Sequence, residues 1–235
     1  MIRSRIAASA FTLTLATAAI IAAPGRAHSA TLYRTYDGTG WHIPTGNGIQ
    51  YLGTGSWRIQ FYDTTSRTTL TPYAKLTAAN ITKATGVTVT VTTTVTKSTT
   101  ACPTGRTIIM RLTSTVTRSA GSQCHTATGA ADGSRVSIAT SNWTAVTLNG
   151  SHDIYHRKVV SHELGHSIGL GHPKTWTTNP SPLMRGDVWG GNTTLTTADD
   201  YTSQDINGLK ALRANATKLR PPAAAINTLN GATTQ

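Results

Sequence analysis

The chain has 235 residues, of which 38% are hydrophobic, and its formal net charge is +12. This length predicts a single domain with a proper hydrophobic core. The lysines and arginines are scattered and form no block of like charge. The charge therefore argues against a nucleic-acid site and predicts only weak binding to anionic surfaces.

The first thirty residues follow the order of a secretory signal peptide. Arg3 and Arg5 precede an apolar run over residues 6–23, and small residues continue to Ala30, so cleavage is expected after Ala27 or Ala30. The alternative is a membrane anchor, because the run approaches spanning length, but its alanines and threonines make it weakly hydrophobic. We therefore expect a secreted, extracellular protein with no stable membrane insertion after signal cleavage.

The predicted elements then follow in chain order. Residues 31–55 have no clear period and form an N-terminal segment, either laid over the domain or a vestigial propeptide. A helix is expected from a cap at Thr71, with Pro72 in its first turn, to Gly86. Alternating or apolar stretches predict five strands, at 57–62, 87–96, 107–112, 134–140 and 143–148. The main domain is placed at 56–214, and 215–235 is expected to be a flexible tail.

Two cysteines, Cys102 and Cys124, are present. In an exported protein they predict one disulfide, and the alternative is a pair of free buried thiols.

The most informative stretch runs from His162 to His172 and has the pattern H-E-x-x-H-x-x-G-x-x-H. Two histidines four apart lie on one face of a helix, so His162 and His166 can reach one ion. Gly169 can end the helix in the left-handed conformation and return the chain, so that His172 completes a three-nitrogen Zn²⁺ site with an open fourth position.

Glu163 is not needed as a ligand in this arrangement. A carboxylate beside the metal can take a proton from a zinc-activated water and pass it to a leaving amine. Glu163 is therefore the predicted general base of a hydrolase.

The motif resembles that of the metzincins, zinc endopeptidases with three histidine ligands and a methionine-containing turn beneath the metal. Residues 181–186 resemble this Met-turn, with Met184 as its methionine, and Pro173 is similar to the serralysin branch. Residues 195–212 resemble the closing helix of matrixins. The resemblance implies an α+β fold with a mixed five-stranded twisted sheet, an active-site helix and a C-terminal helix.

The resemblance also implies a substrate and a binding mode. Protein or peptide substrates would lie extended beside an edge strand, expected at Ser137, Ile138, Ala139 and Thr140. Gly186 stands where serralysins and astacins have a tyrosine, so no oxyanion role is expected at that position. A monomer is expected.

Several alternatives stay open. A structural Ca²⁺ ion could use Asp187, Asp199, Asp200 or Asp205, although helix caps are the better interpretation of these aspartates. His152 and His156 are read as solvated histidines at the helix start rather than as a second metal site. For the whole chain, the competing functions are a non-catalytic zinc-fold binding module at the cell surface and a zinc amidase acting on cell-wall peptides.

Overall fold

The computed structural model describes residues 33–148, 150–176, 181–186 and 200–218 and has an α+β fold. Its elements are β1 (Asp37–Gly38), β2 (Trp41–His42), η1 (Thr45–Asn47), β3 (Trp57–Phe61), α1 (Thr64–Thr85), β4 (Val89–Val95), β5 (Thr107–Thr113), β6 (Ala120–Gly121), β7 (Cys124–His125), β8 (Ala131–Ala139), α2 (Thr140–Ala145), α3 (His152–Ile168) and α4 (Ser203–Ala214).

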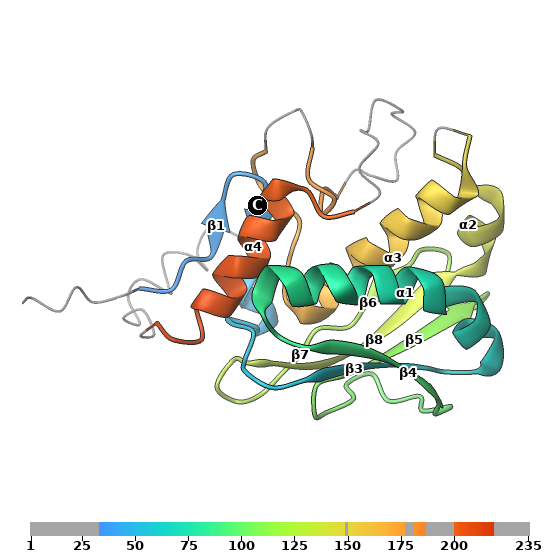
Figure 1. The fold of residues 1–235 in the computed structure, drawn as a ribbon, viewed down its shortest axis with the longest axis horizontal. Coiled ribbons are helices and arrows are strands. Elements are labelled where there is room, and N and C mark those ends of the chain that lie inside the picture. Colours follow the sequence, from blue (N-terminus) through green and yellow to red (C-terminus); the bar gives the residue numbers. More distant parts are fainter. Residues whose placement is uncertain (1–32, 149, 177–180, 187–199, 219–235) are drawn as a thin grey trace, which may run out of the picture. The chain divides into compact units, whose positions relative to one another are not determined.

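The main sheet is mixed and has the strand order β4-β3-β5-β8-β6, with β7 also paired to β8. The first four strands of this order are parallel neighbours, whereas β6 and β7 run antiparallel to β8. Figure 1 shows α1 and α3 side by side over one face of the sheet. The buried strand residues and both helices therefore share one core, which includes Ile59, Ile108 and Leu164.

Helix α1 begins seven residues before the predicted cap. The side chain of Asp63 accepts a hydrogen bond from the Ser66 amide and caps the helix. Pro72 consequently lies inside the helix, where it lacks the N–H of a regular turn. The expected cap at Thr71 is wrong: its hydroxyl instead donates to the Arg67 carbonyl one turn back. Gly86 ends the helix with φ of 70°, as predicted.

The predicted strand at 143–148 is also wrong, because residues 140–145 form helix α2. Trp143 is buried, and Leu148 makes only an isolated bridge with Ser151. The sheet reaches its full width through β6 and β7 instead. These strands have two residues each, which is too short to produce a period in the sequence.

The N-terminal segment belongs to the same compact unit as the rest of the described chain. Ile43, Ile49 and Leu52 are fully buried in the common core. Asn215 is fully buried too, and its side chain donates to the carbonyls of Thr35 and Gln50. Described residues on both sides of the expected boundaries at 55 and 215 therefore belong to one compact unit. Residues 1–32 and 219–235, which hold the expected signal and most of the expected tail, lie outside the described residues.

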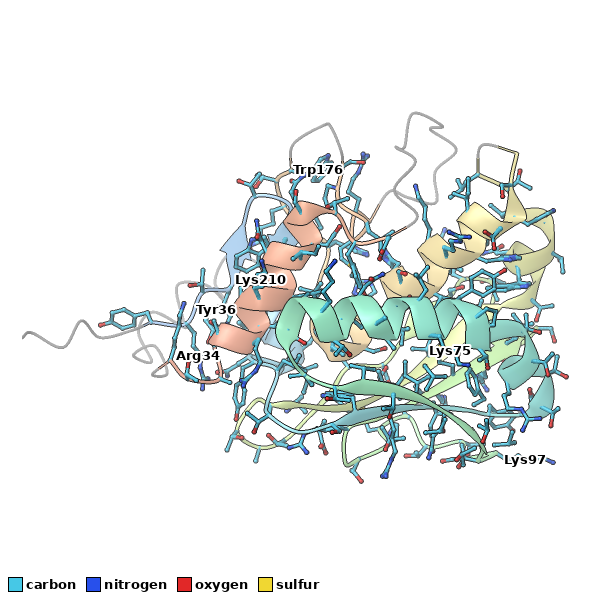
Figure 2. The ribbon with its side chains drawn as sticks, in the orientation of Figure 1. Arg34, Tyr36, Lys75, Lys97, Trp176 and Lys210 are labelled. Atoms are coloured by element: carbon cyan, nitrogen blue, oxygen red, sulfur yellow. A yellow bond between two sulfur atoms is a disulfide. The ribbon has the colours of Figure 1, made fainter. Side chains whose placement is uncertain are left out.

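Cys102 and Cys124 form the predicted disulfide, with their Cα atoms 5.5 Å apart. Basic side chains are exposed on separate elements, as Lys75 on α1, Lys97 after β4 and Lys210 on α4 illustrate (Figure 2). Within the described part of the chain, no helix combines the length and the hydropathy needed to cross a membrane.

Candidate metal centre

Helix α3 carries the first part of the motif. Ser151 is its cap and accepts a hydrogen bond from the Ile154 amide at 3.3 Å. The helix ends at Ile168, and Gly169 follows in the left-handed conformation with φ of 116°. A Cβ atom at Gly169 would lie 2.6 Å from Ile49, so both the conformation and the packing require glycine there.

The chain then returns toward the helix that it has just left. The Leu170 amide donates to the Gly165 carbonyl at 3.0 Å, and the Gly171 amide donates to the His42 carbonyl in β2 at 2.8 Å. The N-terminal segment is thus hydrogen-bonded to the loop that carries His172. This contact gives residues 33–52 a structural role at the site.

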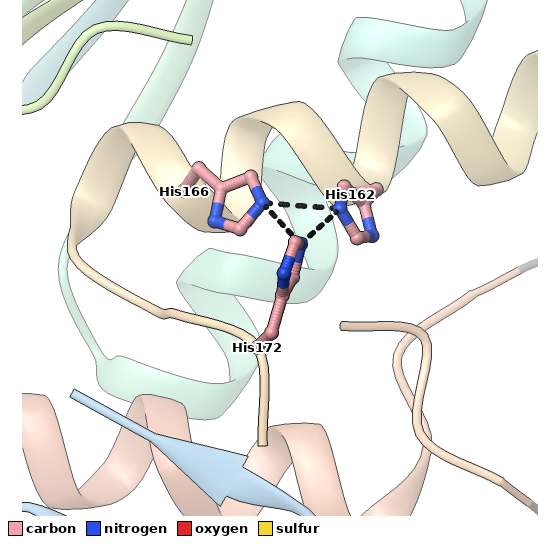
Figure 3. Close-up of side chains that lie close together, drawn as sticks. All are labelled: His162, His166 and His172. Atoms are coloured by element: carbon pink, nitrogen blue, oxygen red, sulfur yellow. Dashed lines mark hydrogen bonds between the residues drawn. The ribbon is translucent and has the colours of Figure 1, made fainter. Parts of the chain in front are cut away.

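The three motif histidines meet at a single point (Figure 3). The Nε2 atom of His166 lies 3.0 Å from that of His162 and 3.2 Å from that of His172, and the third Nε2–Nε2 distance is 3.3 Å. A tetrahedral zinc ion bonded at roughly 2.0–2.1 Å holds its nitrogens about 3.3–3.4 Å apart. The donor set and its spacing therefore fit one such ion.

Backbone carbonyls fix the orientation of two of these rings. His162 Nδ1 lies 2.9 Å from the Leu183 carbonyl, and His166 Nδ1 lies 2.8 Å from the Leu170 carbonyl. A carbonyl only accepts, so each Nδ1 must donate, and in the neutral ring Nε2 keeps its lone pair. Two lone pairs that face each other across 3.0 Å repel one another unless a cation lies between them.

The protonation of the histidines favours the same conclusion. Burial and the neighbouring His166 and His172 hold the pKa of His162 well below its usual range. Burial lowers the pKa of His166 to about 4. Both rings are therefore neutral near pH 7, which is the form that binds a metal.

Glu163 lies on the same helix, buried in the wall of the cavity. Its Oε2 atom accepts no hydrogen bond from any described residue. Burial raises the pKa of this carboxyl to about 8. Glu163 is also the only glutamate in the 235 residues. The side chain is therefore available for proton transfer rather than used in an ion pair.

Met184 lies against helix α3. It is buried, and a Cβ atom at Gly165 would come within 2.5 Å of its sulfur. Gly165 lies between His162 and His166 in the sequence, and the absence of a side chain there leaves room for the Met184 sulfur. The role of Met184 as the methionine beneath the metal stays a prediction.

Gly186 also has a steric reason to be glycine. A Cβ atom at this position would lie 2.7 Å from His172 Nδ1. The tyrosine of serralysins and astacins at this point would therefore press on the third histidine of this chain.

A cavity of about 720 Å³ contains the three histidines and Glu163. Its walls also include Asn142, Tyr155 and the segment 117–121. Burial and the charge of Glu163 raise the pKa of Tyr155 to about 12, so this hydroxyl is protonated at neutral pH.

The four residues of the predicted substrate edge, 137–140, differ in their pairing. Ser137 pairs with Arg111 of β5 on one side and with Ala120 of β6 on the other, and Thr140 belongs to α2. Ile138 and Ala139 pair with β5, and the ladder with β6 ends at Ser137, so a substrate position beside them stays a prediction. The edge beside the cavity is β6, and a Cβ atom at Gly121 would lie 3.7 Å from Glu163 Oε2. The sequence of this segment has no periodic signal that could have identified it.

The remaining polar predictions have mixed outcomes. His152 is exposed, as predicted, whereas His156 is only partly exposed: its ring stacks on Trp143 at 3.6 Å, and its Nε2 atom bonds the Trp143 carbonyl. Asp205 forms the capping box of α4 with Thr202, as the cap interpretation predicts. Asp187 and Asp199 lie outside the described residues. Among the described histidine, cysteine and acidic residues, only His162, His166 and His172 form a group of three or more that could hold a metal ion.

Comparisons with known proteins do not assign the chain to a family. No protein-family model matches the chain, and a search of curated proteins finds no match.

Proposed function

We propose that the chain is a secreted zinc-dependent endopeptidase of the metzincin type. The observation that carries this proposal is the convergence of three histidine Nε2 atoms within 3.3 Å, next to a buried carboxylate that has no hydrogen-bond partner among the described residues. A purely structural zinc site is normally closed by a fourth protein ligand. Three nitrogens at the wall of a cavity leave room for water and substrate.

Each residue then has a defined task. His162, His166 and His172 would hold the ion. When bound, zinc supplies Lewis acidity, which lowers the pKa of water and polarises a peptide carbonyl. Glu163 accepts the proton of the attacking water and returns it to the leaving amine, a contribution of about 10²–10⁴-fold in rate. Burial raises the pKa of Glu163 to about 8 in the metal-free protein, and a cation held by the neighbouring histidines would favour the charged form that accepts a proton.

The sheet offers a place for an extended substrate. Strand β6 pairs with β8 on one side, and its segment lines the cavity on the other. A peptide that adds to this edge gains main-chain hydrogen bonds and passes beside Glu163. Gly121 keeps the approach open, because no side chain separates the strand from the carboxylate.

The test is hydrolysis by the purified mature chain with and without zinc. We expect casein to be cut at internal bonds, the activity to stop with a chelator, and equimolar zinc to restore it. New amino termini identified by mass spectrometry distinguish an endopeptidase from an exopeptidase. The proposal is wrong if a zinc-loaded, folded protein leaves casein and a mixed peptide library intact.

The same preparation separates the alternatives. Cell-wall digestion without casein hydrolysis would support the amidase. Stoichiometric zinc without hydrolysis of either substrate would support a binding module.

A further inference from the structure

One cation in the cavity wall has no task in the reaction described above. Arg118 lines the cavity, and its side chain is exposed. It makes no hydrogen bond or ion pair with any described residue. The one carboxylate in the described lining is Glu163, which is buried beside the histidines. Arg118 therefore adds to the cavity wall a positive charge that no described residue compensates.

The backbone on both sides of Arg118 is held in place. The Ser119 hydroxyl accepts a hydrogen bond from the Ala139 amide at 3.2 Å, and the Thr117 carbonyl accepts one from Asn142 at 3.4 Å. These bonds tie the segment to the end of β8 and to α2. The guanidinium is thus carried by an anchored turn, which reduces the entropy lost when it binds a ligand.

The distance to the reacting groups is limited by the chain. Arg118 precedes Gly121 by three residues, and Gly121 lies against Glu163. Three residues span at most about 11 Å when fully extended. A substrate strand that runs along β6 would therefore bring residues within about three positions of the scissile bond past Arg118.

We propose that Arg118 selects acidic peptides, by pairing with a substrate carboxylate within about three residues of the scissile bond. This proposal rests on the peptidase function above and assigns its substrate class. A guanidinium can bind a carboxylate through two parallel hydrogen bonds, so it favours glutamate over the isosteric glutamine. Because this single guanidinium lies to one side of Glu163, we expect the preference for glutamate at substrate positions on only one side of the scissile bond.

The test measures binding and does not require turnover. The protein is the zinc-loaded Glu163→Gln variant, and the probes are labelled peptides with blocked termini. They differ only in one Glu or Gln moved along an otherwise uncharged sequence. We expect the peptide with Glu near the site to bind about three- to tenfold more tightly than its Gln partner, as measured by fluorescence anisotropy. Adding Arg118→Gln should reduce this ratio to about one.

A matched control separates a local contact from the charge of the whole protein. Lys75→Gln also removes one positive charge, but on α1, outside the cavity lining (Figure 2). It should leave the Glu-to-Gln ratio unchanged. The proposal is overturned if Arg118→Gln and Lys75→Gln have equal effects, if Glu is favoured equally at every position, or if Glu and Gln peptides bind alike.

The outcome is distinct from that of the peptidase proposal. Absence of zinc-dependent hydrolysis by the wild-type chain contradicts the proposed function. The role of Arg118 is tested by the ratio of the affinities for the Glu and Gln peptides, measured on the Glu163→Gln variant. This test does not depend on whether the wild-type chain hydrolyses peptides.

Discussion

Asp205 holds the turn that contains Met184. Its Oδ1 atom accepts a hydrogen bond from the Met184 amide at 3.1 Å, and its Oδ2 atom accepts one from the Leu183 amide at 2.8 Å. The Leu183 carbonyl in turn accepts from His162 Nδ1. The carboxylate that caps α4 is thereby connected to the orientation of His162, a candidate metal ligand.

Removal of this carboxylate should affect both folding and zinc binding. Asp205→Ala leaves two amides of the turn without their acceptor, and we expect a loss of about 2–4 kcal/mol in the free energy of unfolding. Because the turn also orients His162, zinc affinity should fall roughly tenfold. Denaturant unfolding and competitive zinc titration measure the two effects. Asp63→Ala, which removes the cap of α1, should cost about 1 kcal/mol and leave zinc affinity unchanged.

Glu163→Gln should separate metal binding from catalysis. The substitution keeps the size of the side chain and removes its basicity, so zinc should bind with a stoichiometry of one. Peptide hydrolysis should fall by at least about 10²-fold. Metal analysis and casein assays on the same sample provide the measurement. Retention of most of the activity would show that another group accepts the proton.

Gly186→Ala should weaken the metal site. The new Cβ atom would lie 2.7 Å from His172 Nδ1, so the ring or the turn must move. We expect zinc affinity to fall about tenfold, and Gly186→Tyr should have a larger effect. Gly46→Ala is the control, because no atom lies within 4 Å of its added Cβ. Equal zinc affinities for the two alanine variants would contradict the steric argument.

The metal-free site should make stability depend on pH. The pKa of His166 is about 4 in the folded state, below the usual 6.5, and that of His162 is lowered as well. The unfolded chain therefore binds more protons, and stability should fall as the pH drops from 6.5 toward 4. Glu163 acts in the opposite direction, because its raised pKa removes stability as the pH rises from 4.5 to 8.

The Glu163→Gln variant removes the opposing contribution of Glu163, so the pH dependence of its stability reports on the histidines. In this variant without metal, the free energy of unfolding should be of the order of 2–3 kcal/mol lower at pH 4 than at pH 7. Urea unfolding at the two pH values measures it. His166→Asn in the same background should flatten the dependence, and an unchanged slope would contradict the assignment.

The disulfide should contribute to stability without taking part in catalysis. It connects the loop after β4 with β7, and two residues separate the end of β6 from the start of β7. The chain-entropy model assigns about 3 kcal/mol to a loop of this length. Replacement of both cysteines by alanine should lower the free energy of unfolding by about that amount. Zinc stoichiometry measured on the folded variant should stay at one.

The sequence by itself predicted that His162, His166 and His172 come together. The spacing of His162 and His166 is a property of any helix, and Gly169 ends a helix by local sterics, so both could be predicted without knowledge of the fold. Four strands were predictable for a similar reason, because apolar residues alternate with polar ones or follow one another along each of them. They are the strands predicted at 57–62, 87–96, 107–112 and 134–140. These features depend on neighbours in the chain.

Only the tertiary structure decided what lies around the histidines. The edge beside the cavity is β6 rather than β8, because pairing depends on strands that are distant in sequence and β6 is too short to show a period. Asp205 supports the Met184 turn from 21 residues away, and the N-terminal segment fixes the chain that carries His172. A local pattern cannot specify such contacts, since they arise from how separate elements pack in one core.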